Sequence, residues 1–214
     1  MTKRLLLVAG NIGAGKTTLA DRIASRLGWV AGYEHVEDNL FLSDFYADMT
    51  KWAFHLQIYF LGNRAEQHLA LAKSPQSAVI DRSIYEDAHI FARALYEQGN
   101  LSEREYRAYR RVFDLVVEHL PKPDLLLFLD APVPTLMERI HGRGRGMESG
   151  ITADYLALLE RYYKEWTEGF DMCPILRIPA DNLNFVTNDR HISIIVDAIN
   201  DKLAGKEDII FPDS

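Results

Sequence analysis

Five short apolar runs are spaced along the chain, and the sequence between successive runs has helical periodicity. Apolar runs of this length, bounded by glycine or polar residues, predict buried β-strands. The predicted strands span residues 5–9, 30–33, 78–80, 125–129 and 175–178. Strands that alternate with helices are typical of a parallel sheet covered on both faces. The pattern therefore predicts an α/β fold with a doubly wound, five-stranded parallel sheet.

The polar and apolar positions between the strands recur at the spacing of amphipathic helices. The expected helices span residues 18–27, 43–46, 51–72, 85–98, 103–119, 134–141, 153–168 and 191–203. The sequence shows no internal repeat and no low-complexity linker, and 214 residues are enough to bury one core. We therefore expect a single domain over 1–214, with a tail over 205–214 that docks or frays.

Composition narrows the classes of function. The formal net charge is −7, which argues against an extended nucleic-acid-binding surface, because such a surface needs a basic face. The single cysteine, Cys173, cannot form an internal disulfide, and no histidine spacing typical of a zinc site occurs. No apolar run has the length of a membrane span, and no signal-peptide pattern precedes the first strand. We expect a cytoplasmic protein with neither nucleic acid nor membrane as a partner.

The turn after the first predicted strand matches the phosphate-binding pattern G-x-x-x-x-G-K-[ST]. It consists of Gly10, Asn11, Ile12, Gly13, Ala14, Gly15, Lys16 and Thr17, and Thr18 follows at the start of the helix. Glycines let successive backbone N–H groups point at an anion, and the helix adds its positive end. Lys16 is expected to reach the outer phosphates of a nucleotide, and the Thr17 hydroxyl to bind Mg²⁺. The alternative is a glycine turn that only caps the helix.

Polar residues follow several of the predicted strands, at the sheet edge where α/β proteins bind ligands. Besides the glycine-rich turn they are Glu34, Asp81, Arg82, Ser83 and Asp130. Glu34 is the candidate general base, because a carboxylate opposite the phosphates can accept the proton of an attacking hydroxyl. The alternatives are a surface carboxylate or a partner of a helix N-cap. Nearby Glu37 and Asp38 disfavour an acceptor that already carries a phosphate, so a neutral alcohol fits better.

Two helices carry polar side chains at helical spacing. Gln57, Leu61 and Arg64 fall on one face of the predicted helix 51–72, and an amide there can pair with the edge of a base. Asp87 and Phe91 are four residues apart on the next helix, so an acid and a ring can face one pocket, and an Arg64–Asp87 pair would stiffen it. The alternatives are ordinary half-exposed residues for Gln57 and Arg64, and plain core for Phe91.

Glycines and arginines alternate after the helix 134–141. Arg139, Arg143 and Arg145 are the basic residues of this segment, which runs on to Glu148 and Gly150. Glycines allow movement, and arginines can neutralise the charge on a transferred phosphoryl group. We therefore expect a lid over about 142–150. The alternative, a basic helix C-terminus, explains Arg139 and Arg143 but not the alternation.

Together these segments resemble the deoxynucleoside kinases, the family of deoxycytidine, deoxyguanosine and bacterial deoxyadenosine kinases. The resemblance covers nearly the whole chain and rests on the order of its motifs. They are the glycine-rich turn, Glu34-His35-Val36, Phe45-Tyr46, Trp52-Ala53-Phe54-His55-Leu56-Gln57, Asp81-Arg82-Ser83 and the arginine lid. Many relatives have Glu-Pro-Val and Glu-Arg-Ser where this chain has Glu34-His35-Val36 and Asp81-Arg82-Ser83.

The resemblance implies transfer of the γ-phosphoryl group of ATP to the 5′-hydroxyl of a deoxynucleoside by a P-loop kinase. It implies that Glu34 is the base and that Arg82 positions the 5′-oxygen and the phosphoryl group. It further implies the substrate-binding residues Tyr46 and Glu148 for the 3′-hydroxyl, and Gln57, Arg64, Asp87 and Phe91 for the base. Thr17 and Asp81 would hold Mg²⁺, directly or through water.

The resemblance also indicates deoxyadenosine as the first choice of acceptor, with deoxyguanosine and deoxycytidine next, and a homodimer. The apolar content of the helices 51–72 and 85–98 is compatible with such a dimer. Two other functions stay open at this point. A monophosphate kinase resembling thymidylate kinase shares the P-loop and lid but needs more basic groups for its acceptor, and a nucleotide-controlled switch protein needs no acceptor site.

Overall fold

The strands form one parallel sheet in the order β2-β3-β1-β4-β5. The computed structural model describes residues 2–33, 39–144 and 150–206. Its strands are β1 (Leu5–Gly10), β2 (Val30–Gly32), β3 (Ala78–Asp81), β4 (Leu125–Asp130) and β5 (Ile175–Pro179). The predicted sheet is confirmed, and each strand lies within one residue of its expected bounds. The order places the carboxyl end of β3 between those of β2 and β1.

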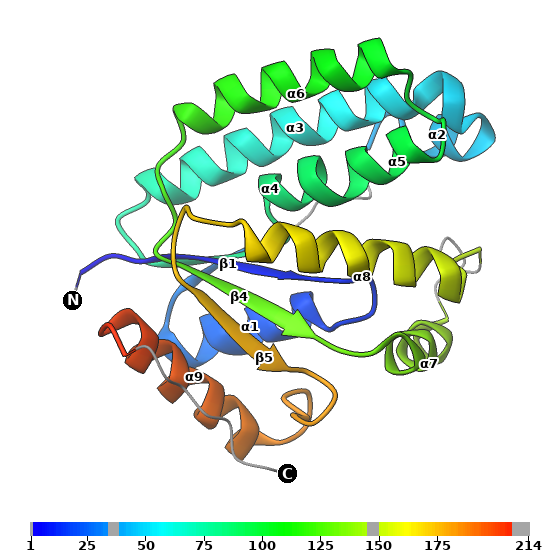
Figure 1. The fold of residues 1–214 in the computed structure, drawn as a ribbon. Helices are drawn as coiled ribbons and strands as arrows, with labels where there is room; N and C mark the ends of the chain where they lie inside the picture. Colours follow the sequence, from blue (N-terminus) through cyan, green and yellow to red (C-terminus); the bar gives the residue numbers. More distant parts are fainter. Residues whose placement is uncertain (1, 34–38, 145–149, 207–214) are drawn as a thin grey trace.

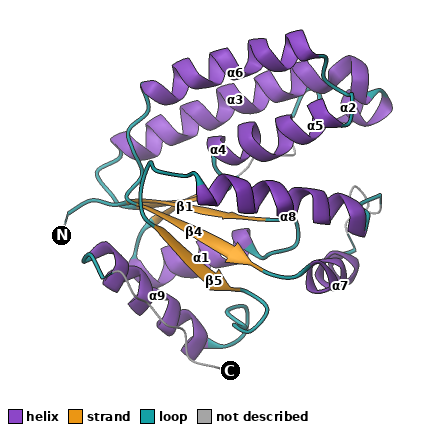
Figure 2. Ribbon diagram, viewed as in Figure 1, coloured by secondary structure: helices purple, strands orange, loops and turns teal. Residues whose placement is uncertain are grey.

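Helices cover both faces of the sheet, and the alternation of side chains along β1 explains why (Figures 1 and 2). Leu5 and Leu7 point into a core shared with α3 (Met49–Lys73), α6 (Glu103–Glu118) and α8 (Ala153–Glu168). Leu6 and Val8 point into the opposite core, which holds α1 (Lys16–Leu27), α7 (Val133–Arg143) and α9 (Asp189–Leu203). Both faces of β1 are fully buried, as expected for the central strand of a doubly wound sheet.

The expected helix over 85–98 is present but is not a regular α-helix. It consists of α4 (Ile84–Glu86), a π-helical turn η1 (Asp87–Ala92) and α5 (Arg93–Glu97). The expected helix is therefore confirmed, but over residues 87–92 its turns are wider than those of an α-helix. A π turn inserts one residue relative to α-helical spacing and occurs often at functional sites. In this chain the π turn carries Asp87 and Phe91, both candidate substrate-binding residues. The short α2 (Leu42–Ala47) completes the helices.

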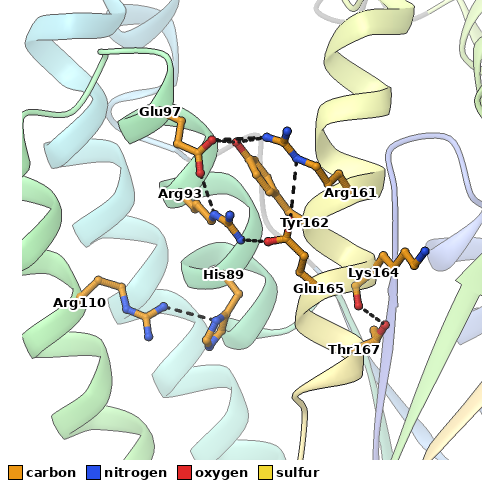
Figure 3. A network of polar contacts seen from close by, with 9 residues as sticks. All are labelled: His89, Arg93, Glu97, Arg110, Arg161, Tyr162, Lys164, Glu165 and Thr167. Carbon is orange, nitrogen blue, oxygen red and sulfur yellow. Dashed lines mark hydrogen bonds and ion pairs between the residues drawn. The ribbon is translucent and has the colours of Figure 1, made fainter.

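A network of charged side chains joins α5 to α8 at the protein surface (Figure 3). Arg93 pairs with Glu97 at 2.9 Å and with Glu165 at 2.6 Å, and the Tyr162 hydroxyl donates to Glu97 at 2.5 Å. The network orients α8, which runs from the lid segment across the sheet.

Several predicted features fall outside the described residues. They include Glu34 with the acidic residues after it, Arg145 and Glu148 of the lid, and most of the tail, 207–214. In the part of the chain that is described, no helix combines the length and the apolar character needed to span a bilayer.

Candidate active site

The predicted P-loop has the backbone conformation of an anion-binding turn. Gly10, Gly13 and Gly15 adopt positive φ angles of 150°, 85° and 97°, which side chains disfavour. The α1 helix begins directly after this turn, and within the described chain no side chain caps its first amides and no acid lies in its first turn. Its N–H groups and its positive end are therefore directed at a ligand of negative charge.

Lys16 lies inside the loop rather than extending into solvent. Its Nζ donates hydrogen bonds to the carbonyl oxygens of Gly10 at 2.8 Å and Asn11 at 2.9 Å, and the residue is buried. Asn11 is fixed in turn, because its Nδ2 donates to the Leu156 carbonyl of α8 at 2.9 Å. These contacts hold an ammonium group at the place where the phosphates are expected.

Thr17 and Asp81 are brought together from the start of α1 and the end of β3. The Thr17 hydroxyl donates a 2.5 Å hydrogen bond to Asp81 Oδ2. The other carboxylate oxygen, Asp81 Oδ1, is buried and has no hydrogen-bond partner among the described residues. A hydroxyl and a carboxylate oxygen are the hard ligands that Mg²⁺ prefers, and Mg²⁺ is bound by few protein groups besides phosphates. The residues present therefore fit the expected metal.

Arg82 has an unusual backbone for a side-chain-bearing residue. Its φ is 65°, and it is the one described residue other than glycine with a positive φ. Its N–H donates to the Val8 carbonyl of β1 at 3.0 Å, and its guanidinium lies 4.4 Å from the centre of the Phe91 ring. Such strained positions persist only where the surroundings fix them, and they cluster at active sites. The structure thus brings two of the predicted site residues, Arg82 and Phe91, into contact.

The expected Arg64–Asp87 pair is present. Arg64 Nε donates to Asp87 Oδ2 at 3.0 Å, and both side chains are 5 % exposed. Gln57, on the same face of α3, is also buried, and its Oε1 has no hydrogen-bond partner in the part of the chain described. The alternative that Gln57 and Arg64 are ordinary half-exposed residues is wrong. A buried amide oxygen without a partner is costly, so this arrangement points to a ligand that supplies a donor.

The arginines of the lid segment are only partly described. Arg139 donates to the Ala180 carbonyl at 2.6 Å and to the Ala14 carbonyl of the P-loop at 3.4 Å, which ties α7 to the phosphate-binding turn. Arg143 ends α7 and is exposed. Tyr46, at 51 % exposure, lies on the outer side of α2 with its ring edge-on to Phe45. The contacts of Arg143 and Tyr46 with ligands remain predictions.

A cavity beside the P-loop was not expected from the sequence. It has a volume of about 350 Å³ and is lined by Ala14, Gly15, Arg139 and the segment 181–186. The ring of Phe185 lies so near Gly15 that an added Cβ would be 3.1 Å from it. The segment 181–186 has neither helical nor strand periodicity, so its sequence does not indicate that it lines a cavity. Only its position after β5, at the ligand-binding edge of the sheet, could have indicated it.

Glu86 was also not predicted. It is fully buried, and its carboxylate accepts hydrogen bonds from residues of the P-loop, the Asp81-Arg82-Ser83 turn and α8. The S-x-x-E pattern of Ser83 and Glu86 signals a helix cap. That signal does not reveal the more distant partners.

This chain is similar to known proteins over nearly its whole length. The family model described as deoxynucleoside kinase matches residues 6–204. The chain is 36 % identical over 197 residues to the deoxyadenosine/deoxycytidine kinase of Bacillus subtilis, covering 91 % of each protein. It is 36 % identical over 208 residues to the deoxyguanosine kinase of Lactobacillus acidophilus, covering 93 % of this chain and 90 % of that protein.

The fold is similar to that of solved deoxyadenosine kinases. The structure of the enzyme from M. mycoides with the products dCMP and a flexible dCDP superposes with a TM-score of 0.80 at 30 % identity, covering 92 % of this chain and 98 % of that chain. The same enzyme with bound dATP gives 0.79 at 29 % identity, covering 92 % and 99 %. With its P-loop, its buried Arg64–Asp87 pair and a family match over nearly its whole length, this chain belongs to the deoxynucleoside kinase family.

Proposed function

We propose that this protein transfers the γ-phosphoryl group of ATP to the 5′-hydroxyl of deoxyadenosine in nucleotide salvage. Deoxyguanosine and deoxycytidine are the next acceptors in order. The observation that carries the acceptor class is the buried set of Gln57, Arg64 and Asp87, because a guanidinium, a carboxylate and an unpartnered amide oxygen suit the polar edge of a base. Cytoplasmic location stays a prediction from the sequence.

The base preference follows from the charges in this set. Asp87 can only accept hydrogen bonds, so it favours an exocyclic amino group and disfavours a carbonyl oxygen. Adenine and cytosine present an amino group beside a ring nitrogen, whereas guanine and thymine present a carbonyl oxygen beside a ring N–H. Phe91 offers a ring for stacking on the base. Asp87 therefore favours deoxyadenosine and deoxycytidine over thymidine, and we place deoxyguanosine ahead of thymidine on the family resemblance.

Catalysis in this proposal comes from positioning and from charge stabilisation. Glu34 accepts the proton of the 5′-hydroxyl as the new O–P bond forms, and the bond between the γ-phosphorus and the oxygen of ADP breaks. Arg82 and Lys16 neutralise charge on the transferred group, joined by Arg139, Arg143 and Arg145 of the lid. Tyr46 and Glu148 hold the 3′-hydroxyl of the sugar.

Thr17 and Asp81 are the residues that would hold Mg²⁺. When bound, the ion neutralises charge on the β- and γ-phosphate oxygens of ATP. The unpartnered Asp81 Oδ1 and the Thr17–Asp81 hydrogen bond support this assignment.

The cavity next to Gly15 is proposed to hold the base of the donor nucleotide. It adjoins the P-loop directly, so a nucleotide with its phosphates on the loop extends into it. The ring of Phe185 and the polar side chains of Asn182 and Asn184 line it, as an adenine site requires.

The test is a comparison of kcat/KM for the four deoxynucleosides with saturating ATP and Mg²⁺. The proposal predicts deoxyadenosine first, deoxyguanosine and deoxycytidine behind it, and thymidine last. An Asp87→Asn variant should lose activity on deoxyadenosine more than on thymidine. A wild-type enzyme that prefers thymidine would contradict the base assignment, and one that phosphorylates thymidylate better than any nucleoside would favour a monophosphate kinase.

We also propose a homodimer formed through α3 and α6. These helices pack side by side, and Ile58 of α3 and Val112 and Leu115 of α6 expose 36 %, 44 % and 61 % of their surface. The apolar content of the segment 85–98 is compatible with a dimer helix, but apolar residues such as Ile90 and Leu95 are used in the core of the monomer. A Leu115→Glu variant should sediment as a monomer, while a dimer that persists in the double variant with Val112→Glu would refute this surface.

A further inference from the structure

The carboxylate of Glu86 is 0 % exposed and lies where three parts of the active site meet. Its Oε1 accepts hydrogen bonds from the N–H of Gly10 at 3.3 Å and from the hydroxyl of Tyr163 at 2.8 Å. Its Oε2 accepts from the N–H of Ser83 at 2.8 Å and from the Ser83 hydroxyl at 3.3 Å. All these partners are donors, so the carboxylate acts here as an acceptor only.

A second residue in the same chain shows what a local helix cap alone requires. Ser102 and Glu105 form the same capping box at the start of α6, with Glu105 accepting from the N–H and the hydroxyl of Ser102. In that box Ser102 is exposed to solvent and Glu105 is only half-buried. Glu86 makes the equivalent local bonds to Ser83 and is in addition buried and bound by two distant segments. Because burying a carboxylate is costly, capping does not account for its position.

The three segments that Glu86 joins are those that carry the reacting groups in the proposed function. Gly10 is the first residue of the P-loop, whose amides and Lys16 face the phosphates. Ser83 directly follows Arg82, which is held at a φ of 65°. Tyr163 lies on α8, whose Leu156 carbonyl fixes Asn11 of the P-loop. Burial raises the pKa of the Tyr163 phenol well above its ordinary value, and the Glu86 charge adds to this shift, so the phenol remains a donor.

We infer that Glu86 is a positioning residue for phosphoryl transfer, which sets the place of Arg82 relative to the P-loop. This inference rests on the proposed function of Arg82. Glu86 does not touch the reacting atoms. It binds two backbone N–H groups, that of Gly10 at the start of the P-loop and that of Ser83 next to Arg82. Its loss should leave ligand binding largely intact and misalign the groups that act in the transition state.

The first test is the Glu86→Gln variant. Glutamine has the same shape, but its NH₂ group must face at least one of the surrounding donors, so one contact of the clamp is lost. We expect kcat to fall by about 10- to 100-fold, since small misplacements have effects of this size. The KM values for ATP and the nucleoside should stay within about threefold of wild type, as for groups that act only in the transition state.

Two control variants test whether the loss of a helix cap, or the loss of a carboxylate that joins two helices, is enough to lower kcat. Glu105→Gln alters the equivalent capping box on α6, and Glu97→Gln removes a carboxylate that binds the hydroxyl of Tyr162 on α8. Among the described residues, the hydrogen bonds of Glu97 and Glu105 go to neither the P-loop nor the Arg82 turn. Both variants should keep the kcat of wild type, even if their stability falls.

A second variant tests the inference if Glu86→Gln does not fold. Glu86→Asp keeps the charge, but its shorter side chain cannot reach Gly10, Ser83 and Tyr163 together. We expect a folded protein by circular dichroism with kcat lowered in the same direction. Wild-type kcat in either folded variant would overturn the inference.

Failure of the proposed function can be told apart from failure of the Glu86 inference. It would appear as a wild-type enzyme that phosphorylates no deoxynucleoside, and the inference would fall with it. Each variant is assayed with whichever deoxynucleoside the wild type prefers, so an error in base preference alone leaves the comparison valid.

Discussion

Arg64 and Asp87 form an ion pair of 3.0 Å that is almost completely removed from solvent. Arg64 comes from the middle of α3 and Asp87 from the first position of the π turn, so the pair joins two elements through residues that are 23 positions apart in sequence. Arg64 Nη1 also donates to the Asp81 carbonyl at 3.4 Å. The group that we propose to read the base is thus connected to the end of β3.

Asp87→Ala is expected to destabilise the fold strongly. Removal of one partner leaves the other charge buried and uncompensated, which costs about 3–5 kcal/mol of unfolding free energy. Urea unfolding followed by circular dichroism measures this loss. The control is Arg107→Ala, which breaks the exposed Arg107–Glu103 pair and should cost below about 1 kcal/mol. Equal losses in the two variants would contradict the buried role of Asp87.

Stability should fall as the pH drops from neutral toward 4. Burial lowers the pKa of His89 to about 4, and the neighbouring Arg110 and Arg93 add to this shift (Figure 3). Between pH 6.5 and 4 the unfolded imidazole binds a proton that the folded one does not, so acid favours unfolding. The loss through His89 is at most about 3 kcal/mol, because one pKa unit corresponds to about 1.4 kcal/mol.

Unfolding free energies measured at several pH values in wild type and His89→Gln test this expectation. The variant should lose less stability than wild type over this range. Part of the dependence should remain, because burial also lowers the pKa of His68. If the unfolding free energies of the two proteins fall in parallel with pH, His89 is not a source of the pH dependence.

Gly10→Ala is expected to damage the P-loop. The residue has a φ of 150°, and an added Cβ would lie 2.8 Å from the Leu129 carbonyl oxygen of β4. Strain of this kind costs about 1–3 kcal/mol, and affinity for ATP should also fall because the loop must shift. Isothermal titration with ATP and thermal unfolding measure the two effects. Gly142→Ala on α7 meets open space and should instead stabilise by about 0.5–1 kcal/mol.

Glu34→Gln tests the proposed base. Turnover should fall by about two to four orders of magnitude, the usual contribution of a positioned general base, while ATP still binds. Rapid-quench measurement of phosphoryl transfer and a separate ATP titration distinguish the two properties. Turnover near that of wild type would remove Glu34 from this role.

The sequence was sufficient for the sheet and for the P-loop because both depend on local pattern. Apolar runs bounded by polar residues located all five strands, and the spacing of glycines with Lys16 and Thr17 located the phosphate site. Helical spacing also placed Gln57 and Arg64 on the buried face of α3. Each of these features is encoded within a few turns or one loop.

Features that depend on contacts between residues far apart in the sequence could not be predicted from local pattern. The sequence predicts a helix over 85–98, but nothing in its pattern indicates the π turn at Asp87–Ala92. Glu86 looks like any capping glutamate until the fold brings Gly10 and Tyr163 to it. Arg139 was assigned to the lid from its neighbours in sequence, whereas its hydrogen bond to the Ala180 carbonyl depends on the position of the loop after β5.

The most direct test of the account follows the label from [γ-³²P]ATP with deoxyadenosine, 2′,5′-dideoxyadenosine and dAMP as acceptors in parallel. We expect labelled dAMP from deoxyadenosine, no labelled product from the analogue without a 5′-hydroxyl, and little labelled dADP from dAMP. Label that passes mainly to dAMP to give dADP, or only to inorganic phosphate, would contradict it.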